Sequence, residues 1–279
     1  MIESDLCSYP LDGDDLMTMS ESELVKVCVR SFRLQGADSA VYRVAKTAVV
    51  KVDFDISLRE ASNMIYVAEY TNGQLRLPKV YRSFACGGKS YTVMQYVEGE
   101  CLNSAPWVSR DPEQRASIIR QAADAILVLR SLRGKTPGPI ESGSPIGGLF
   151  SIYGANKMFS DCREMEKWLD QKLKLRGGGS LKGRFDTLVM CHMDIALRNM
   201  KLDGRGQLWF LDWAWSGFYP PEFEIASLHH KEPGNFDYEF SQALLQELGS
   251  AETDEVLTLL LTVYEVNDGP YVGSHLLES

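Results

Sequence analysis

Two neighbouring stretches decide the fold: CHMDIALRNM, residues Cys191–Met200, and LWFLDW, residues Leu208–Trp213. They contain Asp194 and Asn199, five positions apart, and then Asp212 after a short apolar run. A carboxylate and an amide oxygen that converge on Mg²⁺ would meet the metal requirement of phosphoryl transfer, because hard cations prefer oxygen ligands. Asn199 and Asp212 would converge if the apolar strands beside them pair. The second carboxylate, Asp194, would then orient or deprotonate an acceptor hydroxyl.

The residues before this region alternate between short β-prone runs and helical patterns. Residues 21–30 form an amphipathic pattern that Ser20 would cap. Apolar residues recur at a helical period over residues 58–70, and Ser57 with Glu60 three positions on is typical of a capping box at the start of a helix. We expect three strands, this helix and then two further strands. The strands are expected over 32–34, 41–44, 48–52, 78–84 and 91–97.

The remainder of the chain is mainly helical. Ile118 to Leu129 follow a 3.6-residue period, and glycine-rich loops separate the later elements. Helices are expected over 112–132, 160–175, 240–248 and 252–266, and strands over 188–191 and 208–211. A β-rich first third before a helical remainder is an α+β pattern. We expect an N-terminal nucleotide-binding lobe over residues 1–97, with a loose tail over 1–15, and a C-terminal lobe over 98–279 with the catalytic loop and the acceptor pocket.

Composition excludes several function classes. The 29 basic and 38 acidic residues give a net charge of −9, which argues against nucleic acid as the main partner. No run approaches the roughly 20 apolar residues that a membrane-spanning helix needs, and residues 1–15 lack the layout of a signal peptide. Six cysteines show no CxxC pair, so we expect reduced thiols and a cytoplasmic protein. The oligomeric state is not indicated.

The pattern HxDxxxxN, followed by a hydrophobic strand that ends in Asp, resembles the catalytic core shared by protein kinases, choline kinases and aminoglycoside phosphotransferases. DWAWSGFYPPEFE, residues Asp212–Glu224, is similar to the DWExxGxxP segment of the aminoglycoside and choline kinase-like branch. Fungal members of that branch resemble the chain most, over about residues 32–230. The resemblance implies a bilobal, protein kinase-like fold with an antiparallel sheet and one helix in the N-terminal lobe.

The same resemblance implies the roles of the residues in the catalytic segment. Asp194 would be the catalytic carboxylate, and Asn199 and Asp212 would bind the Mg²⁺ of Mg·ATP. His192 would pack the catalytic loop without acting as an acid or base. Arg198 would either contact the substrate or pair with an acidic neighbour, and the sequence favours neither.

Nucleotide contacts are implied in the N-terminal lobe. Lys51 would reach the α- and β-phosphates of ATP, although a solvent-facing lysine on an edge strand would fit the pattern too. Glu60 would hold Lys51, or would only cap the helix with Ser57. Ser39, or the backbone amides of residues 36–40, would cover the phosphates. The hinge residues that would offer backbone hydrogen bonds to adenine are Gln95, Tyr96 and Val97.

Three positions depart from the family pattern. Ala214 stands where an acidic residue is common, Met193 stands where a small residue is frequent, and the first turn has a single glycine, Gly36. Ala214 and Met193 keep a second reading open, in which the chain is a pseudokinase that binds nucleotide or a partner protein without transferring phosphate. Four aromatic residues would either line an acceptor pocket or pack the C-terminal lobe: Trp213, Trp215, Phe218 and Tyr219.

The length of one segment indicates the kind of acceptor. Only nine residues, 213–221, separate Asp212 from Glu222. That length leaves no room for the peptide platform of a protein kinase. We therefore expect an ATP-dependent phosphotransferase that acts on a hydroxyl of a small molecule. Activation of a carboxyl group or transfer of a nucleotidyl group in the same cleft remains an alternative.

Overall fold

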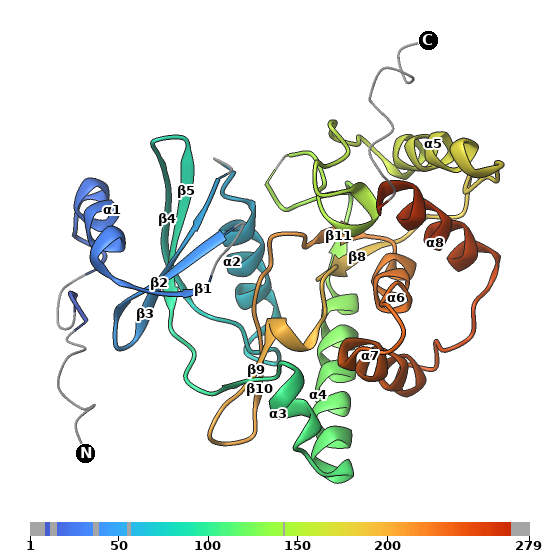
Figure 1. Ribbon diagram of the computed structural model, residues 1–279. Helices are drawn as coiled ribbons and strands as arrows, with labels where there is room; N and C mark the ends of the chain where they lie inside the picture. The colour runs from blue at the N-terminus through green and yellow to red at the C-terminus, as the bar shows by residue number, and fades with distance from the viewer. Residues whose placement is uncertain (1–8, 12–15, 36–38, 55–56, 142, 269–279) are drawn as a thin grey trace. The chain divides into compact units, whose positions relative to one another are not determined.

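The computed structural model describes residues 9–11, 16–35, 39–54, 57–141 and 143–268, and it divides the chain into two compact units. The first unit comprises Met1–Glu100 and Lys201–Leu211, and the second comprises Cys101–Met200 and Asp212–Ser279. The first unit is built on an antiparallel sheet and the second is mainly helical, which confirms the expected α+β class (Figure 1). The sequence did not predict that residues 201–211 join the first unit.

The sheet of the first unit has five antiparallel strands in the order β1-β2-β3-β5-β4. Three strands, a helix and two strands follow one another along the chain, as predicted. The central position of β3 rules out the alternative that Lys51 lies on an edge strand. The strands are β1 (Phe32–Gln35), β2 (Ser39–Ala45), β3 (Ala48–Asp53), β4 (Val80–Cys86) and β5 (Lys89–Gln95).

Two helices, α1 (Glu21–Arg30) and α2 (Arg59–Thr71), lie on opposite faces of this sheet (Figure 1). The side chains of α1 pack with Val50 and Val52 in one hydrophobic cluster. Because successive side chains of a strand point to opposite faces, Lys51 between these valines points toward α2. The strand alternation therefore places the lysine on the face that α2 covers.

The caps of the two helices differ from each other. Ser20 caps α1 in a capping box with Glu23, which confirms Ser20 as the N-cap. The capping box predicted for α2 is wrong: the N-cap is Leu58, which makes no side-chain hydrogen bond. The hydroxyl of Ser57 instead accepts a hydrogen bond from the backbone N–H of Arg59.

The second unit contains six α-helices among the described residues. Four of them overlap the predicted ranges, and α7 begins earlier than expected because the side chain of Asn235 accepts a hydrogen bond from Tyr238 and caps it. The helix α6 was not predicted, because Phe223 to Leu228 are all buried and show no amphipathic period. The helices are α3 (Ser104–Val108), α4 (Pro112–Ser131), α5 (Cys162–Leu173), α6 (Pro221–His229), α7 (Phe236–Glu247) and α8 (Glu255–Asp268).

Aromatic side chains form much of the core of the second unit. Phe150 contacts the rings of Trp168, Tyr219 and Phe223. Trp213 is also fully buried, so Trp213 and Tyr219 pack the core instead of lining a pocket.

Two small sheets carry the segments that decide the fold. β8 (Leu188–Cys191) is fully buried between β7 (Arg133–Gly134) and β11 (Gly217–Tyr219), and β9 (Met200–Leu202) lies between β10 (Leu208–Phe210) and β6 (Glu100–Cys101). The strands over 188–191 and 208–211 therefore do not pair with each other. β8 pairs instead with the strand that follows Asp212, with Cys191 opposite Gly217.

Two further findings concern the described part of the chain. The cysteines within it, Cys28, Cys86, Cys101, Cys162 and Cys191, are free thiols. None of its helices combines the length and the apolar character needed to cross a membrane.

Candidate active site

The turn that follows β8 is held by α6. The carboxylate of Glu224 accepts hydrogen bonds from the backbone N–H groups of His192, at 2.5 Å, and Met193, at 3.1 Å. The hydroxyl of Ser227, one helical turn later, donates to the carbonyl of Met193 at 3.0 Å. Met193 has a φ of 68°, a left-handed conformation that is unfavourable for a non-glycine residue. These contacts hold the backbone of Met193 in this conformation.

Glu224 is almost completely buried, with 2% of its surface exposed. Burial raises the pKa of this carboxyl to about 7, although the N–H groups of His192 and Met193 favour the ionised form. Ionised Glu224 is thus an anion with little access to water, and it lies against the turn at His192 and Met193 that precedes Asp194. The sequence analysis did not identify this residue as part of the site.

His192 has the packing role that the resemblance implied. Its side chain is fully buried and its ring lies against Trp213, with ring centroids 4.5 Å apart. The Nδ1 atom of His192 accepts a hydrogen bond from the backbone N–H of Asp194 at 3.3 Å, and its carbonyl accepts one from Ser216 at 3.1 Å. His192 therefore links the turn before Asp194 to the segment after Asp212.

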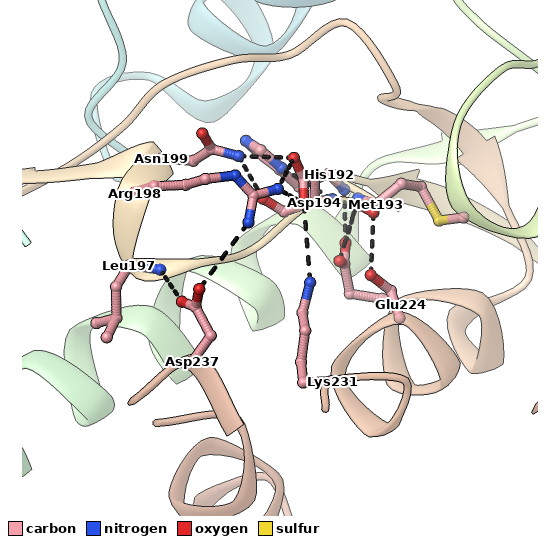
Figure 2. Close-up of polar contacts among 10 residues, drawn as sticks. His192, Met193, Asp194, Leu197, Arg198, Asn199, Glu224, Lys231 and Asp237 are labelled. Carbon is pink, nitrogen blue, oxygen red and sulfur yellow. Dashed lines mark hydrogen bonds and ion pairs between the residues drawn. The ribbon is translucent and has the colours of Figure 1, made fainter. Parts of the chain in front are cut away.

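The carboxylate of Asp194 is buried and lies at the centre of a hydrogen-bonded group (Figure 2). The Nη2 atom of Arg198 lies 2.7 Å from both carboxylate oxygens. The Nδ2 atom of Asn199 donates to Oδ2 at 2.8 Å and to the backbone carbonyl of Asp194 at 3.0 Å. Arg198 thus pairs with an acidic neighbour, while its side chain is half exposed, so that a contact with substrate stays a prediction.

Two further charged residues of this group were missed by the sequence analysis. Asp237, in the first turn of α7, accepts a hydrogen bond from the backbone N–H of Leu197 at 2.7 Å and lies 4.0 Å from Arg198. Lys231, just after α6, has its Nζ atom 3.8 Å from Oδ1 of Asp194. Both lie far along the chain from the catalytic motif. The helix-start signal at Asn235 would have indicated Asp237, but no pattern in the sequence indicates Lys231.

The chemistry of two residues fits a Mg²⁺ site. The amide nitrogen of Asn199 is directed at Asp194, and Figure 2 shows its oxygen on the other side of the amide, available as a ligand. Asp212 is half-buried and has a φ of 61°, a strained conformation of the kind found at functional sites. One amide oxygen and one carboxylate suit Mg²⁺, which usually completes its coordination with phosphate oxygens and water. Within the described residues no cluster of three or more His, Cys, Asp or Glu could hold a metal ion.

The first unit brings Lys51 and Glu60 together. The Nζ atom of Lys51 lies 2.8 Å and 3.0 Å from the two carboxylate oxygens of Glu60. Each residue is only 5% exposed. The alternative that Glu60 only caps α2 is therefore wrong.

The other expected nucleotide contacts lie at the ends of two inner strands of the sheet, β2 and β5. Ser39 begins β2, but its side chain and residues 36–38 lie outside what the structure describes. The backbone N–H groups of Gln95 and Tyr96 donate within the first unit, to Lys79 and Thr47. The carbonyl of Val97 accepts a hydrogen bond from Lys201 at 2.8 Å. These groups are already used, so adenine would have to contact other backbone groups of this stretch.

Three comparisons with known proteins bear on the site. The model of the phosphotransferase enzyme family (APH) matches residues 30–257. No curated protein sequence matches the chain.

Among solved structures, the chain is similar to aminoglycoside phosphotransferase APH(4)-Ia, with a TM-score of 0.60, 14% sequence identity and 88% of each chain covered. A ternary complex of a thermostable mutant of that protein with ADP and hygromycin B has a TM-score of 0.58 at 14% identity, again with 88% of each chain covered. A streptomycin–ATP complex of APH(2")-IIa has a TM-score of 0.57 at 15% identity and covers 90% of this chain and 87% of the other. These similarities show the fold, which is the kinase-like fold of aminoglycoside phosphotransferases, and the family model covers most of the chain. The protein therefore belongs to the phosphotransferase enzyme family.

Proposed function

We propose that the protein transfers the γ-phosphoryl group of Mg·ATP to a hydroxyl group of a small molecule. One observation carries this proposal: the buried carboxylate of Asp194 is held by Arg198 and Asn199 on a turn that α6 fixes. A fixed carboxylate beside a candidate metal ligand is the arrangement that phosphoryl transfer requires, because this chemistry depends on positioning and on neutralisation of charge.

In the proposed reaction, Asp194 accepts a hydrogen bond from the acceptor hydroxyl. The acceptor oxygen forms a bond to the γ-phosphorus, the bond from that phosphorus to the bridging oxygen of ADP breaks, and the hydroxyl proton passes to Asp194. Arg198 and Asn199 donate hydrogen bonds to the carboxylate and hold it in one rotamer. Asn199 and Asp212 would hold Mg²⁺, which supplies positive charge to the phosphate oxygens.

The first unit would hold the nucleotide in this proposal. Lys51 would donate to the α- and β-phosphates while Glu60 keeps its ammonium in place. The solved structures with ADP and with ATP named above support a nucleotide as donor. Their aminoglycoside ligands support a small hydroxyl-bearing molecule as acceptor, without identifying it. The short path from Asp212 to α6, which passes only through β11, supports a small acceptor too.

The test uses the purified full chain with γ-labelled ATP, Mg²⁺ and a metabolite extract. We expect label in a small molecule, and we expect Asp194→Asn to keep nucleotide binding while it lowers turnover by about 10²-fold or more, as for a lost general base. Asp124→Asn is a matched control, because Asp124 is exposed on α4. Wild-type turnover in Asp194→Asn would contradict the assignment.

The same experiment separates the alternatives. A pseudokinase would bind Mg·ATP, and no metabolite would gain phosphate. Transfer of a nucleotidyl group would place label from α-labelled ATP, not from γ-labelled ATP, in the product. Either result would refute the proposed function.

A further inference from the structure

Lys231 is a half-buried cation beside the carboxylate of Asp194 that the proposed reaction does not use. It lies in the short segment between α6 and α7, outside the catalytic loop, and its side chain is 17% exposed. Figure 2 shows this side chain extending toward Asp194 from below, whereas Arg198 and Asn199 reach the same carboxylate from the left. Burial lowers the pKa of the Lys231 ammonium, and the charge of Asp194 opposes that shift.

The partners of Lys231 differ from those of Arg198. Arg198 contacts both oxygens of Asp194 at 2.7 Å and lies near Asp237 as well. Lys231 has a single ion pair, at 3.8 Å, and among the residues that the structure describes its ammonium makes no hydrogen bond. An ammonium has three donors, and one that is largely withdrawn from water is less favourable without close partners. An oxygen-rich ligand at this place would supply them.

The position of Lys231 determines what such a ligand is. An acceptor hydroxyl bound to Asp194 lies about 3 Å from that carboxylate. The groups on the neighbouring carbon atoms of the acceptor then come within reach of the ammonium, which is itself 3.8 Å from Oδ1 of Asp194. An amino group there would be repelled by Lys231, whereas a carboxylate or phosphate would be bound by it.

We propose that the acceptor carries an anionic group, a carboxylate or a phosphate monoester, next to the hydroxyl that receives the phosphoryl group, and that Lys231 binds this anion. The inference rests on the proposed function, because it assumes that Asp194 faces the acceptor. It assigns to this chain an acceptor whose charge is opposite to that of an amine-bearing sugar.

The first experiment separates a metabolite extract by charge before the assay. Anion-exchange, cation-exchange and unbound fractions are each incubated with the full chain, Mg²⁺ and γ-labelled ATP. Acceptor activity in the anion-exchange fraction is the expected result. Activity in the cation-exchange or unbound fraction would overturn the inference and leave the proposed function intact, whereas no labelled product in any fraction would refute both.

A second step identifies the anion. Treatment of the anion-exchange fraction with phosphatase, followed by removal of the phosphatase, abolishes acceptor activity if the anion is a phosphate monoester. The activity survives if the anion is a carboxylate.

The second experiment tests Lys231 itself on the active fraction. Lys231→Gln should raise the KM for the acceptor by about tenfold or more, the loss expected for a charged hydrogen bond, with kcat and the KM for ATP nearly unchanged. Lys231→Arg should restore much of the acceptor affinity. Lys167→Gln is the control, because Lys167 is exposed on α5.

Three outcomes would assign Lys231 another role and overturn the inference. A higher KM for ATP in Lys231→Gln would place the ammonium on the nucleotide phosphates. A lower kcat with unchanged KM values would make Lys231 a positioning residue for Asp194. If Lys231→Gln does not fold, the Lys231→Arg variant is used in its place. If its KM for the acceptor is as high as its KM for a neutral analogue of the acceptor, binding of an anion is contradicted.

Discussion

Replacement of Glu224 by glutamine should make the stability of the protein depend less on pH. Glu224 is buried under the catalytic turn, and its folded-state pKa is about 7, against 4.5 for an ordinary glutamate. Because the folded-state pKa is raised, the folded state binds more protons than the unfolded state between these two values. The stability that this group contributes is therefore fully present below pH 4.5 and is lost as pH rises through 7.

The magnitude follows from the two pKa values. The interval from 4.5 to about 7 corresponds to about 3 kcal/mol of stability lost between pH 4.5 and pH 8.5 in the wild type. Glutamine resembles the protonated carboxyl, since each has a carbonyl oxygen that can accept hydrogen bonds from the backbone N–H groups of His192 and Met193, and a second group that donates. Glu224→Gln should therefore have nearly wild-type stability at pH 5 and should gain relative to the wild type at higher pH. For a chain of this size, the midpoint of thermal unfolding of Glu224→Gln should rise relative to that of the wild type by roughly 6–12 °C between pH 4.5 and pH 8.5.

The assay is thermal unfolding of wild type and Glu224→Gln in parallel from pH 5 to pH 8.5. Titration of all other groups cancels in the difference between the two proteins. Glu247→Gln is the control, because Glu247 is exposed near the end of α7 and its midpoint should follow the wild type at every pH. A difference between Glu224→Gln and wild type that stays constant with pH, or that moves in favour of the wild type as pH rises, would refute the reasoning.

Two further predictions concern the scaffold. Glu60→Gln leaves the buried ammonium of Lys51 without its carboxylate partner. We expect the free energy of unfolding, measured by heat or urea, to fall by about 3 kcal/mol, and the binding of a labelled nucleotide to weaken. The double variant Lys51→Met/Glu60→Leu should regain the stability but not the nucleotide binding, and recovery of both would contradict the assigned role. Gly147→Ala should destabilise by more than about 2 kcal/mol, because its Cβ atom would lie 2.0 Å from the ring of Trp215 and its φ is 82°. The matched change Gly249→Ala, where φ is 66° and the space is open, should cost about 1 kcal/mol, and equal losses at the two glycines would exclude steric overlap as the cause.

The sequence predicted the elements whose signals are local. The period of α4 was clear because one face of this helix is buried and the other is not. The strand β3 is buried on both faces, and its valine-rich run indicated a strand without any alternation. The helix α6 was missed for the opposite reason, since burial on all sides leaves no period to detect. The capping box proposed for α2 failed because Glu60 is paired with Lys51, a contact that only the folded sheet and helix can show.

The candidate site divides in the same way. Asp194 and Asn199 lie five positions apart, and their hydrogen bond follows from that local spacing. Arg198 was ambiguous, because the choice between a substrate and an acidic partner depends on rotamers. Glu224 and Lys231 come from a distant part of the chain and act through contacts that leave no pattern in the sequence. The roles in metal, nucleotide and acceptor binding remain predictions to be tested by the variants described above.

The hydrogen bonds from α6 and α7 to the segment around Asp194 have a consequence for folding during synthesis of the chain. The turn at His192 and Met193 is fixed by Glu224 and Ser227, and the loop after it is fixed by Asp237, all of which are synthesised later. A nascent chain that has emerged only as far as the catalytic motif therefore has its chemical groups but not their geometry. The hydrogen-bonded arrangement around Asp194 is therefore completed only after Asp237 has been synthesised.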